Sequence, residues 1–209
     1  TTMIAAFTVF IMLELIFQCN YEVEHAFRSS VFQVVSFITT TGLYSDDAAK
    51  WPHVTWVVLA ACMFFGGSSG STSGGIKSIR GVMLLKIVKN EFRQILHPNA
   101  VLPMKIDGYN VQMSKRVTLL GFIGLYLFLA VICAFTMIAA GIDSTNSMTI
   151  TLSCLGNVGP TLGLEIGPTM SWNELPDFAK WISSFLMLVG RLELFSVLVL
   201  FTPSFWKEN

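Results

Sequence analysis

The sequence predicts an all-α integral membrane protein built from two tandem units, each a span, a short helix, a loop and a second span. Three observations predict this fold class. Hydrophobic residues make up 53% of the 209 residues and charged residues only 12%, whereas soluble domains carry about 25% charged residues. Apolar stretches long enough to enter a bilayer recur along the chain. Long and short stretches also alternate in the same order twice.

Charge and cysteine content exclude several other classes. Thirteen basic and thirteen acidic residues cancel, so the chain has no net basic field for nucleic acid. The four cysteines, Cys19, Cys62, Cys133 and Cys154, lie beside or within apolar stretches and form no CxxC pair, which argues against a disulfide scaffold or a zinc site. Because Thr1 opens almost directly onto an apolar run without a signal-peptide pattern, we expect the chain to be part of a longer protein.

The first unit covers the first three apolar stretches. Residues 3–17 carry one charge, Glu14, near their end, and predict a span. Residues 26–38 are too short to cross a bilayer, which takes about 20 helical residues, so we expect a short helix that re-enters the membrane. A helix lying on the membrane surface is the alternative. Residues 54–65 predict a second span that breaks at a run of glycines.

The second unit repeats this order. Residues 117–140 hold no charge and are long enough to cross a bilayer outright. Residues 148–155 are again too short to span, and the same two interpretations apply to them. Residues 181–201 predict the fourth span, although Arg191 and Glu193 lie in its middle.

The distribution of charge predicts the orientation of these spans. The connection between the second and third spans is rich in basic residues, and Lys207 follows the fourth span, so both should be cytoplasmic. Residues 18–51 and 143–180 hold eight acidic residues against three basic ones, which predicts an acidic outer face that concentrates cations. The basic residues of the connection are Lys77, Arg80, Lys86, Lys89, Arg93, Lys105, Lys115 and Arg116, and the outer acids are Glu22, Glu24, Asp46, Asp47, Asp143, Glu165, Glu174 and Asp177.

An internal repeat relates the two short helices. Residues 36–42 (SFITTTG) align without a gap on residues 153–159 (SCLGNVG), at an offset of 117 residues. Only the serine and the glycine are identical. Pro52 and Pro176 precede the second and fourth spans, and proline suits a helix start, where its missing N–H costs nothing.

The chemistry of the loop after each short helix favours a small cation. Irregular backbone at membrane depth persists only where protein or a water-filled cavity surrounds it. Glycine permits backbone angles that turn carbonyl groups toward an axis, and a ring of carbonyls can replace the water shell of an alkali cation. A short helix would also direct its partly negative C-terminal end at the centre. The residues alone therefore predict a cation path.

The segment at residues 66–75, all Gly, Ser or Thr, has several interpretations. A phosphate loop requires glycine directly before lysine, but Ile76 separates Gly75 from Lys77. The string at residues 67–70 (GSSG) fits an intramembrane serine hydrolase, which needs a histidine on a neighbouring span. His25, His53 and His97 all lie in predicted connections. A packing region of small residues and a flexible segment lodged in a pore both stay open, and we favour the second.

Arg191 is the most informative single residue. An arginine at the centre of a span costs about 2.5–3.5 kcal/mol on insertion scales, so it should face protein or water. Glu193, two positions further on, faces another side of a helix and is a poor partner. We therefore expect Arg191 to meet carbonyls and hydroxyls of residues 66–75 from the facing unit.

The cytoplasmic connection predicts local structure of its own. Apolar and basic residues alternate over residues 76–95 at helical spacing, which places basic side chains near the anionic leaflet. His97-Pro98-Asn99 ends this helix. Residues 101–111 predict a small hairpin turning at Asp107-Gly108, with a solvated linker as the alternative.

Four motifs in this order resemble the Trk/Ktr/HKT superfamily of potassium transporters, and most of all the bacterial TrkH type of uptake subunit. They are residues 37–42 (FITTTG), 65–77 (FGGSSGSTSGGIK), 157–160 (NVGP) and 190–193 (GRLE). Relatives often have Leu where Val158 stands, Gly where Thr161 stands, and a third Gly where Ser73 stands. The resemblance implies a potassium-channel-like fold of four pseudo-symmetric span–pore helix–span units, of which this chain is the third and fourth. Half of the pore then lies upstream.

The resemblance also implies roles for residues. One side of a selectivity filter is Thr40, Thr41 and Gly42, and another is Asn157, Val158 and Gly159, with K⁺ held at Thr40, Thr41, Asn157 and Val158. The intramembrane gate is Gly66, Gly67, Ser68, Ser69, Gly70, Ser71, Thr72, Ser73, Gly74 and Gly75, together with Arg191.

The same resemblance implies an organisation and partners. Residues 1–96 are the third pore unit, 97–115 a cytoplasmic linker with a hairpin, and 116–209 the fourth unit. Potassium is the transported substrate, with no organic cofactor and no enzyme activity in this chain. The expected setting is the bacterial inner membrane, as a multi-pass homodimer with cytosolic nucleotide-binding regulatory subunits of the TrkA type. A sodium-permeable relative, a serine hydrolase and a non-conducting structural subunit are the alternatives.

Overall fold

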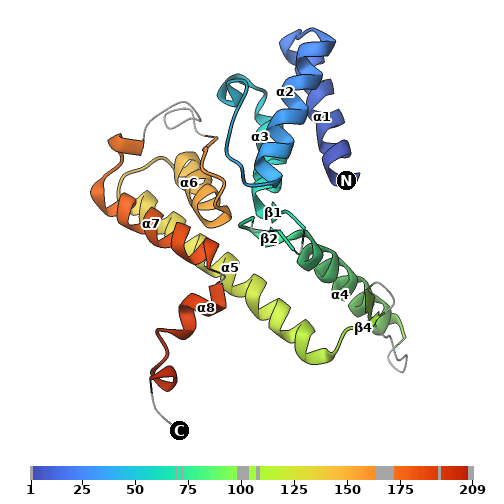
Figure 1. Ribbon diagram of the computed structural model, residues 1–209, viewed down its shortest axis with the longest axis vertical. Helices are drawn as coiled ribbons and strands as arrows, with labels where there is room; N and C mark the ends of the chain where they lie inside the picture. Colours follow the sequence, from blue (N-terminus) through green and yellow to red (C-terminus); the bar gives the residue numbers. More distant parts are fainter. Residues whose placement is uncertain are drawn as a thin grey trace.

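The computed structural model describes residues 2–68, 70–71, 73–97, 104–106, 109–162, 172–192 and 194–206. This part of the chain is mostly helical, as predicted, and its strands form only two-residue pairs (Figure 1). The helices are α1 (Thr2–Cys19), α2 (Val23–Ile38), α3 (His53–Phe64), α4 (Ser78–Leu96), α5 (Met113–Ala139), α6 (Ser144–Gly156), α7 (Asp177–Arg191) and α8 (Leu194–Val199), with 3-10 turns at Ala48–Lys50, Trp172–Glu174 and Pro203–Phe205.

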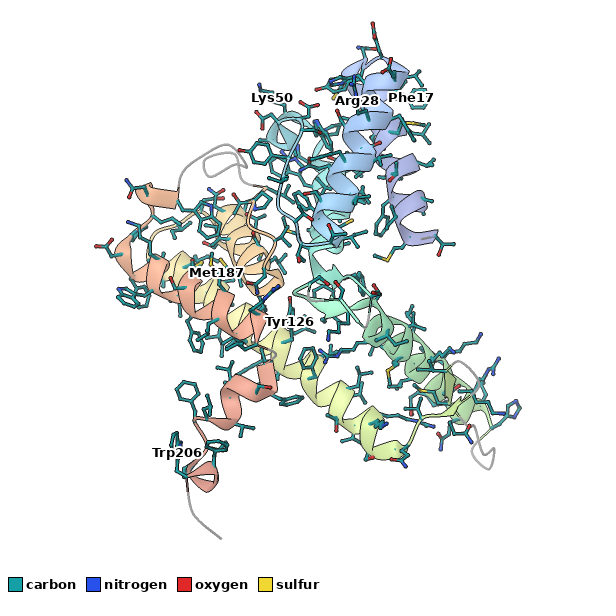
Figure 2. The ribbon with its side chains drawn as sticks, in the orientation of Figure 1. Phe17, Arg28, Lys50, Tyr126, Met187 and Trp206 are labelled. Atoms are coloured by element: carbon teal, nitrogen blue, oxygen red, sulfur yellow. The ribbon has the colours of Figure 1, made fainter. Side chains whose placement is uncertain are left out.

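The first three helices form one packed group. Helix α1 lies along α2, and α3 contacts both of them. Their shared interior includes Ile11, Leu15, Phe37 and Leu59, which have no exposed surface. This group occupies one end of the long axis, where Phe17, Arg28 and Lys50 lie, whereas Trp206 lies toward the other end (Figure 2).

Helices α5, α6 and α7 form the second group. The short helix α6 contacts both α5 and α7, and its residues Ile150 and Leu155 are fully buried with Leu186 and Val189 of α7. Half of the residues in α2 and more than half of those in α6 are buried. Each short helix packs against its neighbouring helices, and its re-entry into the membrane stays a prediction.

Each hydrophobic core contains residues from the other half of the chain. Val158 and Leu162, which follow α6, belong to the cluster formed by α1, α2 and α3. Ile76, which precedes α4, belongs to the cluster around α5, α6 and α7. Helices α3 and α6 are also in contact. The segments that follow the short helices and the segment between α3 and α4 thus meet where the two groups join.

The helix starts agree with the sequence. Pro52 and Pro176 stand at the N-cap positions of α3 and α7, as the proline pattern predicts. Helix α6 begins with a side-chain cap, because the Asp143 carboxylate accepts hydrogen bonds from the backbone N–H groups of Thr145 and Asn146, at 2.9 and 3.4 Å. Both short helices are longer than predicted and begin three and four residues earlier.

Two described helices, α1 and α5, are long and apolar enough to cross a membrane, and α3 is apolar but has only 12 residues. The prediction that the second span breaks at the glycines is confirmed, because α3 ends at Phe64. Residues 181–201, the predicted fourth span, do not form one continuous helix. Helix α7 ends at Arg191, and the separate short helix α8 starts at Leu194; Glu193 lies outside the described residues.

Gly190, in the last turn of α7, packs closely against the end of α6. A Cβ atom on Gly190 would clash with the Leu155 carbonyl oxygen and lie 2.5 Å from the Asn157 side-chain nitrogen. The last turn of α7 is therefore fixed against the end of α6. Arg191 is the last residue of α7, so the argument that it and Glu193 face different sides of one helix does not apply.

The connection from α4 to α5 has the helix end and the strand pairing that its sequence predicts. Helix α4 ends at Leu96, and His97 is its C-cap. Strand β3 (Lys105–Ile106) pairs antiparallel with β4 (Tyr109–Asn110), with Ile106 opposite Tyr109, as a hairpin requires; the predicted turn residues Asp107 and Gly108 lie outside the described residues. Helix α4 also contacts α5, and the hairpin lies near their joined ends (Figure 1).

Candidate functional site

The first loop, residues 39–43, turns back sharply at the end of α2. Thr40 adopts a left-handed backbone conformation with φ of 54°, and Gly42 has φ of 74°. The N–H groups of Thr40 and Thr41 donate to the carbonyls of Phe37 and Ser36, at 3.2 and 2.9 Å. Hydroxyl groups are concentrated here, and Thr39 Oγ1 lies 2.8 Å from Thr41 Oγ1.

The second loop, residues 157–161, makes the same turn at the end of α6. Asn157 is left-handed with φ of 53°, and Gly159 has φ of 106°. The N–H groups of Asn157 and Val158 donate to the carbonyls of Cys154 and Ser153, at 3.1 and 3.0 Å. Asparagine tolerates the left-handed region better than most residues because its short side chain bonds locally.

The two loops correspond position by position at the offset of the sequence repeat. Thr40 and Asn157 are 117 residues apart, as are Gly42 and Gly159, and all four have positive φ. The two backbone hydrogen bonds of each loop also occur at equivalent positions. Ser36 and Ser153, the identical serines of the repeat, each use the hydroxyl to bond a later backbone group: Ser36 Oγ donates to the Leu43 carbonyl, and Ser153 Oγ accepts from Gly159 N–H at 3.1 Å.

The loops are also in direct contact. A Cβ atom on Gly42 would clash with the Val158 carbonyl oxygen and lie 3.3 Å from Pro160 Cδ. Only glycine fits Gly42, because both its φ angle and its contact exclude a side chain. Val158 buries its side chain, whereas Thr41 and Gly159 are exposed. Backbone groups, with the threonine hydroxyls, are therefore the chemistry that this junction offers.

The glycine-rich segment, residues 66–75, forms a loop closed at its base. Strand β1 (Phe65–Gly66) pairs parallel with β2 (Ile76–Lys77), an interaction that the sequence did not predict. Ser78 fastens the same point, because its hydroxyl donates to the Gly66 carbonyl at 2.7 Å. Within the segment, Gly67 N–H donates to Ser73 Oγ at 2.9 Å. Two of the predicted gating residues, Ser69 and Thr72, lie outside the described residues, whereas Gly66, Gly67, Ser68, Gly70, Ser71, Ser73, Gly74 and Gly75 lie within them.

This segment packs directly against the end of α6, where the second loop begins. A Cβ atom on Gly74 would clash with the Gly156 carbonyl oxygen. A Cβ atom on Gly156 would in turn lie 2.9 Å from the Met63 carbonyl oxygen of α3. The C-terminal end of α6, the end of α3 and the glycine-rich segment therefore converge with backbone against backbone, so that small changes in one displace the others.

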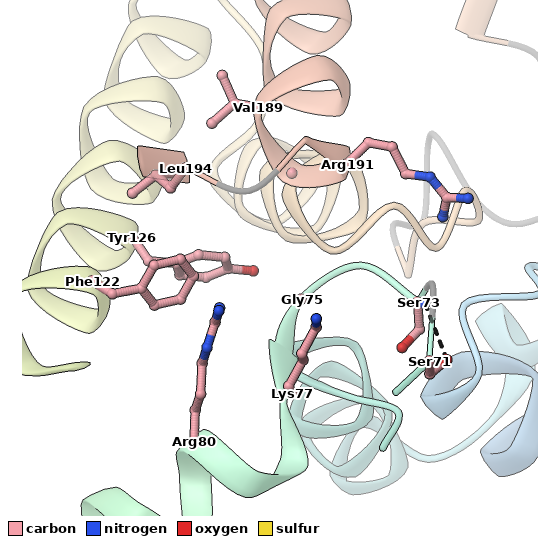
Figure 3. A pocket seen from close by; sticks show the side chains of 11 residues that line it. Ser71, Ser73, Gly75, Lys77, Arg80, Phe122, Tyr126, Val189, Arg191 and Leu194 are labelled. Atoms are coloured by element: carbon pink, nitrogen blue, oxygen red, sulfur yellow. Dashed lines mark hydrogen bonds between the residues drawn. The ribbon is translucent and has the colours of Figure 1, made fainter. Parts of the chain in front are cut away.

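Arg191 and the glycine-rich segment border the same cavity, which has a volume of about 90 Å³ (Figure 3). Ser71, Ser73 and Gly75 line it from the segment, and Arg191 lines it from the end of α7. Arg191 therefore lies near this segment, and its expected contact with the segment's carbonyls and hydroxyls stays a prediction. The remaining lining residues are Lys77, Arg80, Phe122, Tyr126, Val189, Gly190 and Leu194.

Two contacts of the site carried no signal in the sequence. The Asn157 side-chain amide donates to the Met187 carbonyl at 3.1 Å and so ties the second loop to α7. The Arg80 guanidinium stacks over the Phe122 ring, 4.1 Å from its centroid, which joins α4 to α5. Side-chain contacts between segments far apart in sequence leave no periodic pattern. Ser153 is different, because its identity with Ser36 in the repeat distinguished it in the sequence.

The structure also bears on the other predicted groups. His25 lies in α2, His53 is the first residue of α3, and His97 follows α4, and none of them lines the cavity beside the glycine-rich segment. In the described part of the chain, no three His, Cys, Asp or Glu side chains could hold a metal ion together. On the predicted outer side, burial and then the nearby Asp46 carboxylate raise the pKa of Tyr21.

Comparison with known proteins gives consistent matches over most of the chain. The TrkH family, described as "Cation transport protein", matches residues 2–208. The Trk system potassium uptake protein TrkH of Halomonas elongata is 38% identical over 189 residues, which cover 90% of this chain and 39% of that protein. The protein of the same name from Escherichia coli K12 is 38% identical over 181 residues, covering 87% of this chain and 37% of that protein.

A solved structure matches as well. The crystal structure of the potassium transporter TrkH from Vibrio parahaemolyticus superposes with a TM-score of 0.91 at 33% identity, over 99% of this chain and 44% of that chain. This chain thus spans less than half the length of these relatives. They are transport proteins and not enzymes, which removes the serine hydrolase from the alternatives.

Proposed function

This chain belongs to the TrkH family of cation transport proteins, and on that premise we propose that it supplies two units of a path through which potassium crosses a cell membrane. Potassium is then the transported substrate, and the chain provides half of the pore. Curated relatives are named potassium uptake proteins, which supports the choice of ion. In this proposal residues 1–96 and 116–209 are two pseudo-symmetric pore units, joined by a cytoplasmic linker at residues 97–115.

The observation that carries the proposal is the pair of equivalent, touching loops. Two turns with the same positive-φ positions meet where Gly42 packs on the Val158 carbonyl. A cation without its water shell needs several oxygen atoms held at one place, and this junction brings the backbone of residues 40–42 to that of residues 157–159. Helices α2 and α6 both end at the junction, and their C-terminal ends favour positive charge. The proposed filter residues are Thr40, Thr41, Gly42, Asn157, Val158 and Gly159.

We further propose that the glycine-rich segment and Arg191 form the gate below these loops. Gly74 packs on the Gly156 carbonyl, so movement of the segment reaches the second loop directly. A fixed positive charge at Arg191 beside the segment would oppose cation passage while the gate is closed. Arg191→Ala should raise flux and weaken regulation, and Arg191→Lys, which keeps the charge, should stay near the wild type. Unchanged flux in an inserted Arg191→Ala protein would contradict this role.

The organisation around this pore is proposed from the family and from the charge pattern. The basic connection supports a cytoplasmic position for α4, and the family supports a bacterial inner membrane. A homodimer, regulated by cytosolic nucleotide-binding subunits of the TrkA type, is the expected assembly. Loss of regulated flux when those subunits are removed from proteoliposomes, with basal flux retained, is the expected result.

A matched pair of glycines gives the experiment that tests the function. Gly159 and Gly141 both have large positive φ, 106° and 91°, and a Cβ atom added to either would have no other atom within 4 Å. Alanine strains both backbones similarly, by about 1–3 kcal/mol. Gly141 lies in the turn between α5 and α6, outside the proposed filter, so Gly141→Ala is the control. Rubidium and sodium tracer uptake should be measured in liposomes that carry the full-length protein with Gly159→Ala or Gly141→Ala.

The proposal predicts that rubidium uptake exceeds sodium uptake in the wild type and in Gly141→Ala, and that Gly159→Ala lowers this ratio. Gly159→Asp, which adds an anion at the same place, should alter uptake further. Equal uptake of both ions by the wild type would keep the pore and favour a sodium-permeable relative. A ratio that is insensitive to Gly159 substitutions would favour a structural subunit.

A further inference from the structure

A strongly basic hollow lies at the far end of α4, away from the two loops and the glycine-rich segment. Its volume is about 220 Å³. The described residues that line it include four cations and no acid: Lys86, Lys89, Asn90, Arg93, Met104 and Lys105. None of these residues borders the cavity at Arg191. The hollow is therefore a separate feature that the transport proposal does not use.

The hollow is built from α4 and the first strand of the hairpin. Lys86, Lys89 and Arg93 recur at intervals of three and four residues, so they share one face of the helix. Strand β3 is fixed against this face, because Lys86 Nζ donates to the Lys105 carbonyl at 2.8 Å and Met104 is almost fully buried. Lys89, Arg93 and Lys105 are exposed around the hollow.

An apolar stripe runs along α4 beside the basic face. Val82, Leu85 and Val88 are exposed by 46%, 72% and 43% and recur at intervals of three residues, from the hollow toward the N-terminal end of α4. Leu85 stands one residue before Lys86, which turns it by about 100° around the helix. The acid Glu91 is two positions from both Lys89 and Arg93, so it lies on another side of α4 and does not line the hollow.

We propose that this hollow binds the phosphate group of an anionic phospholipid of the cytoplasmic leaflet, with the acyl chains along the apolar stripe of α4. Phosphate oxygens accept charge-assisted hydrogen bonds from lysine, and arginine binds them in pairs. Basic pockets at the cytoplasmic side of membrane helices suit anionic headgroups. A soluble phosphate would use the cations but leave the stripe without a partner, so both features together favour a lipid. The inference does not depend on which ion the protein carries.

Lipid retention by the purified full-length protein tests the proposal. The protein is reconstituted in nanodiscs that contain phosphatidylglycerol as a minor component in phosphatidylcholine, and lipids that remain bound after extraction are counted by native mass spectrometry. The variants are Lys89→Gln and Arg93→Gln. Lys115→Gln is the matched control, because it removes one exposed positive charge from the same connection outside the hollow. Lys86 is left unchanged because it holds strand β3.

Each variant in the hollow should bind phosphatidylglycerol roughly fivefold more weakly, whereas Lys115→Gln should match the wild type. Phosphatidylcholine retention should not change. Three results would overturn the proposal. They are an equal loss of phosphatidylglycerol binding in Lys115→Gln, displacement of phosphatidylglycerol by inorganic phosphate alone, and unchanged phosphatidylglycerol binding in both variants of the hollow. Equal melting temperatures of variants and wild type show that the exposed substitutions leave the fold intact.

Discussion

The loop after α2 and the loop after α6 have the same backbone path but different side-chain support. Thr40, a β-branched residue, holds the left-handed position in the first loop, and Asn157, which tolerates it, holds the second. The first loop is exposed at Thr39 and Thr41 and carries paired hydroxyls. The second buries Val158 and is tied to α7 through Asn157 and Met187. What the two share is the position of backbone groups, which is the geometry that the proposed filter uses.

Gly42→Ala is the substitution that should disrupt the shared geometry of the two loops most severely. It combines a left-handed φ with a clash against the Val158 carbonyl, so one loop can keep its path only by displacing the other. We expect the rubidium-to-sodium uptake ratio to fall about tenfold or more, which is the effect of about 1.4 kcal/mol or more on ion discrimination. Gly124→Ala, on α5 with no atom within 4 Å of its added Cβ, is the control. A wild-type ratio in Gly42→Ala would refute the contact between loops.

Substitution of glycine for Thr40 and for Asn157, the two equivalent left-handed residues, should change the free energy of unfolding in opposite directions. Thr40→Gly removes the strain of a β-branched residue, about 1–2 kcal/mol, and should raise the free energy of unfolding. Asn157→Gly keeps the backbone but deletes the amide bond to the Met187 carbonyl, and should lower it by about 1 kcal/mol. Denaturant unfolding in detergent measures both. Equal effects of the same sign would mean that the two loops are supported alike.

Much of this arrangement could be predicted from the sequence, because it is encoded locally. The apolar stretch lengths predicted the short helices and the interrupted α3, and the serine and glycine shared at the offset of 117 residues predicted equivalent loops. Pro52 and Pro176 marked two helix starts correctly.

The missed features depend on contacts between distant segments. Nothing after Arg191 in the sequence resembles a helix stop, although α7 ends there, next to the close packing of Gly190 on the end of α6. The pairing of β1 with β2 joins only two residues from each side of the glycine-rich segment, too few to leave an alternating pattern. The assignment of ion-binding roles to the loops likewise stays a prediction from the family resemblance.

The smallest effects should come from the two serines that support the loops. Ser153→Ala removes the acceptor of the Gly159 N–H, and Ser36→Ala removes the donor to the Leu43 carbonyl. Each should cost about 0.5–1.5 kcal/mol of unfolding free energy, with a modest loss of selectivity. Thermal melting together with tracer uptake measures both quantities. A large loss of selectivity in only one variant would show that one loop alone sets the ion preference.

The most direct test of the central claim is to locate the ion. Crystals of the full-length protein grown in rubidium, with data collected at the rubidium absorption edge, give an anomalous map that places bound ions without reference to the protein chain. We predict a peak at the junction of the loops, within direct coordination distance of backbone oxygens from both residues 40–42 and residues 157–159. A peak that contacts only one loop, or rubidium bound elsewhere with none at this junction, would contradict the claim that the two loops form one cation path.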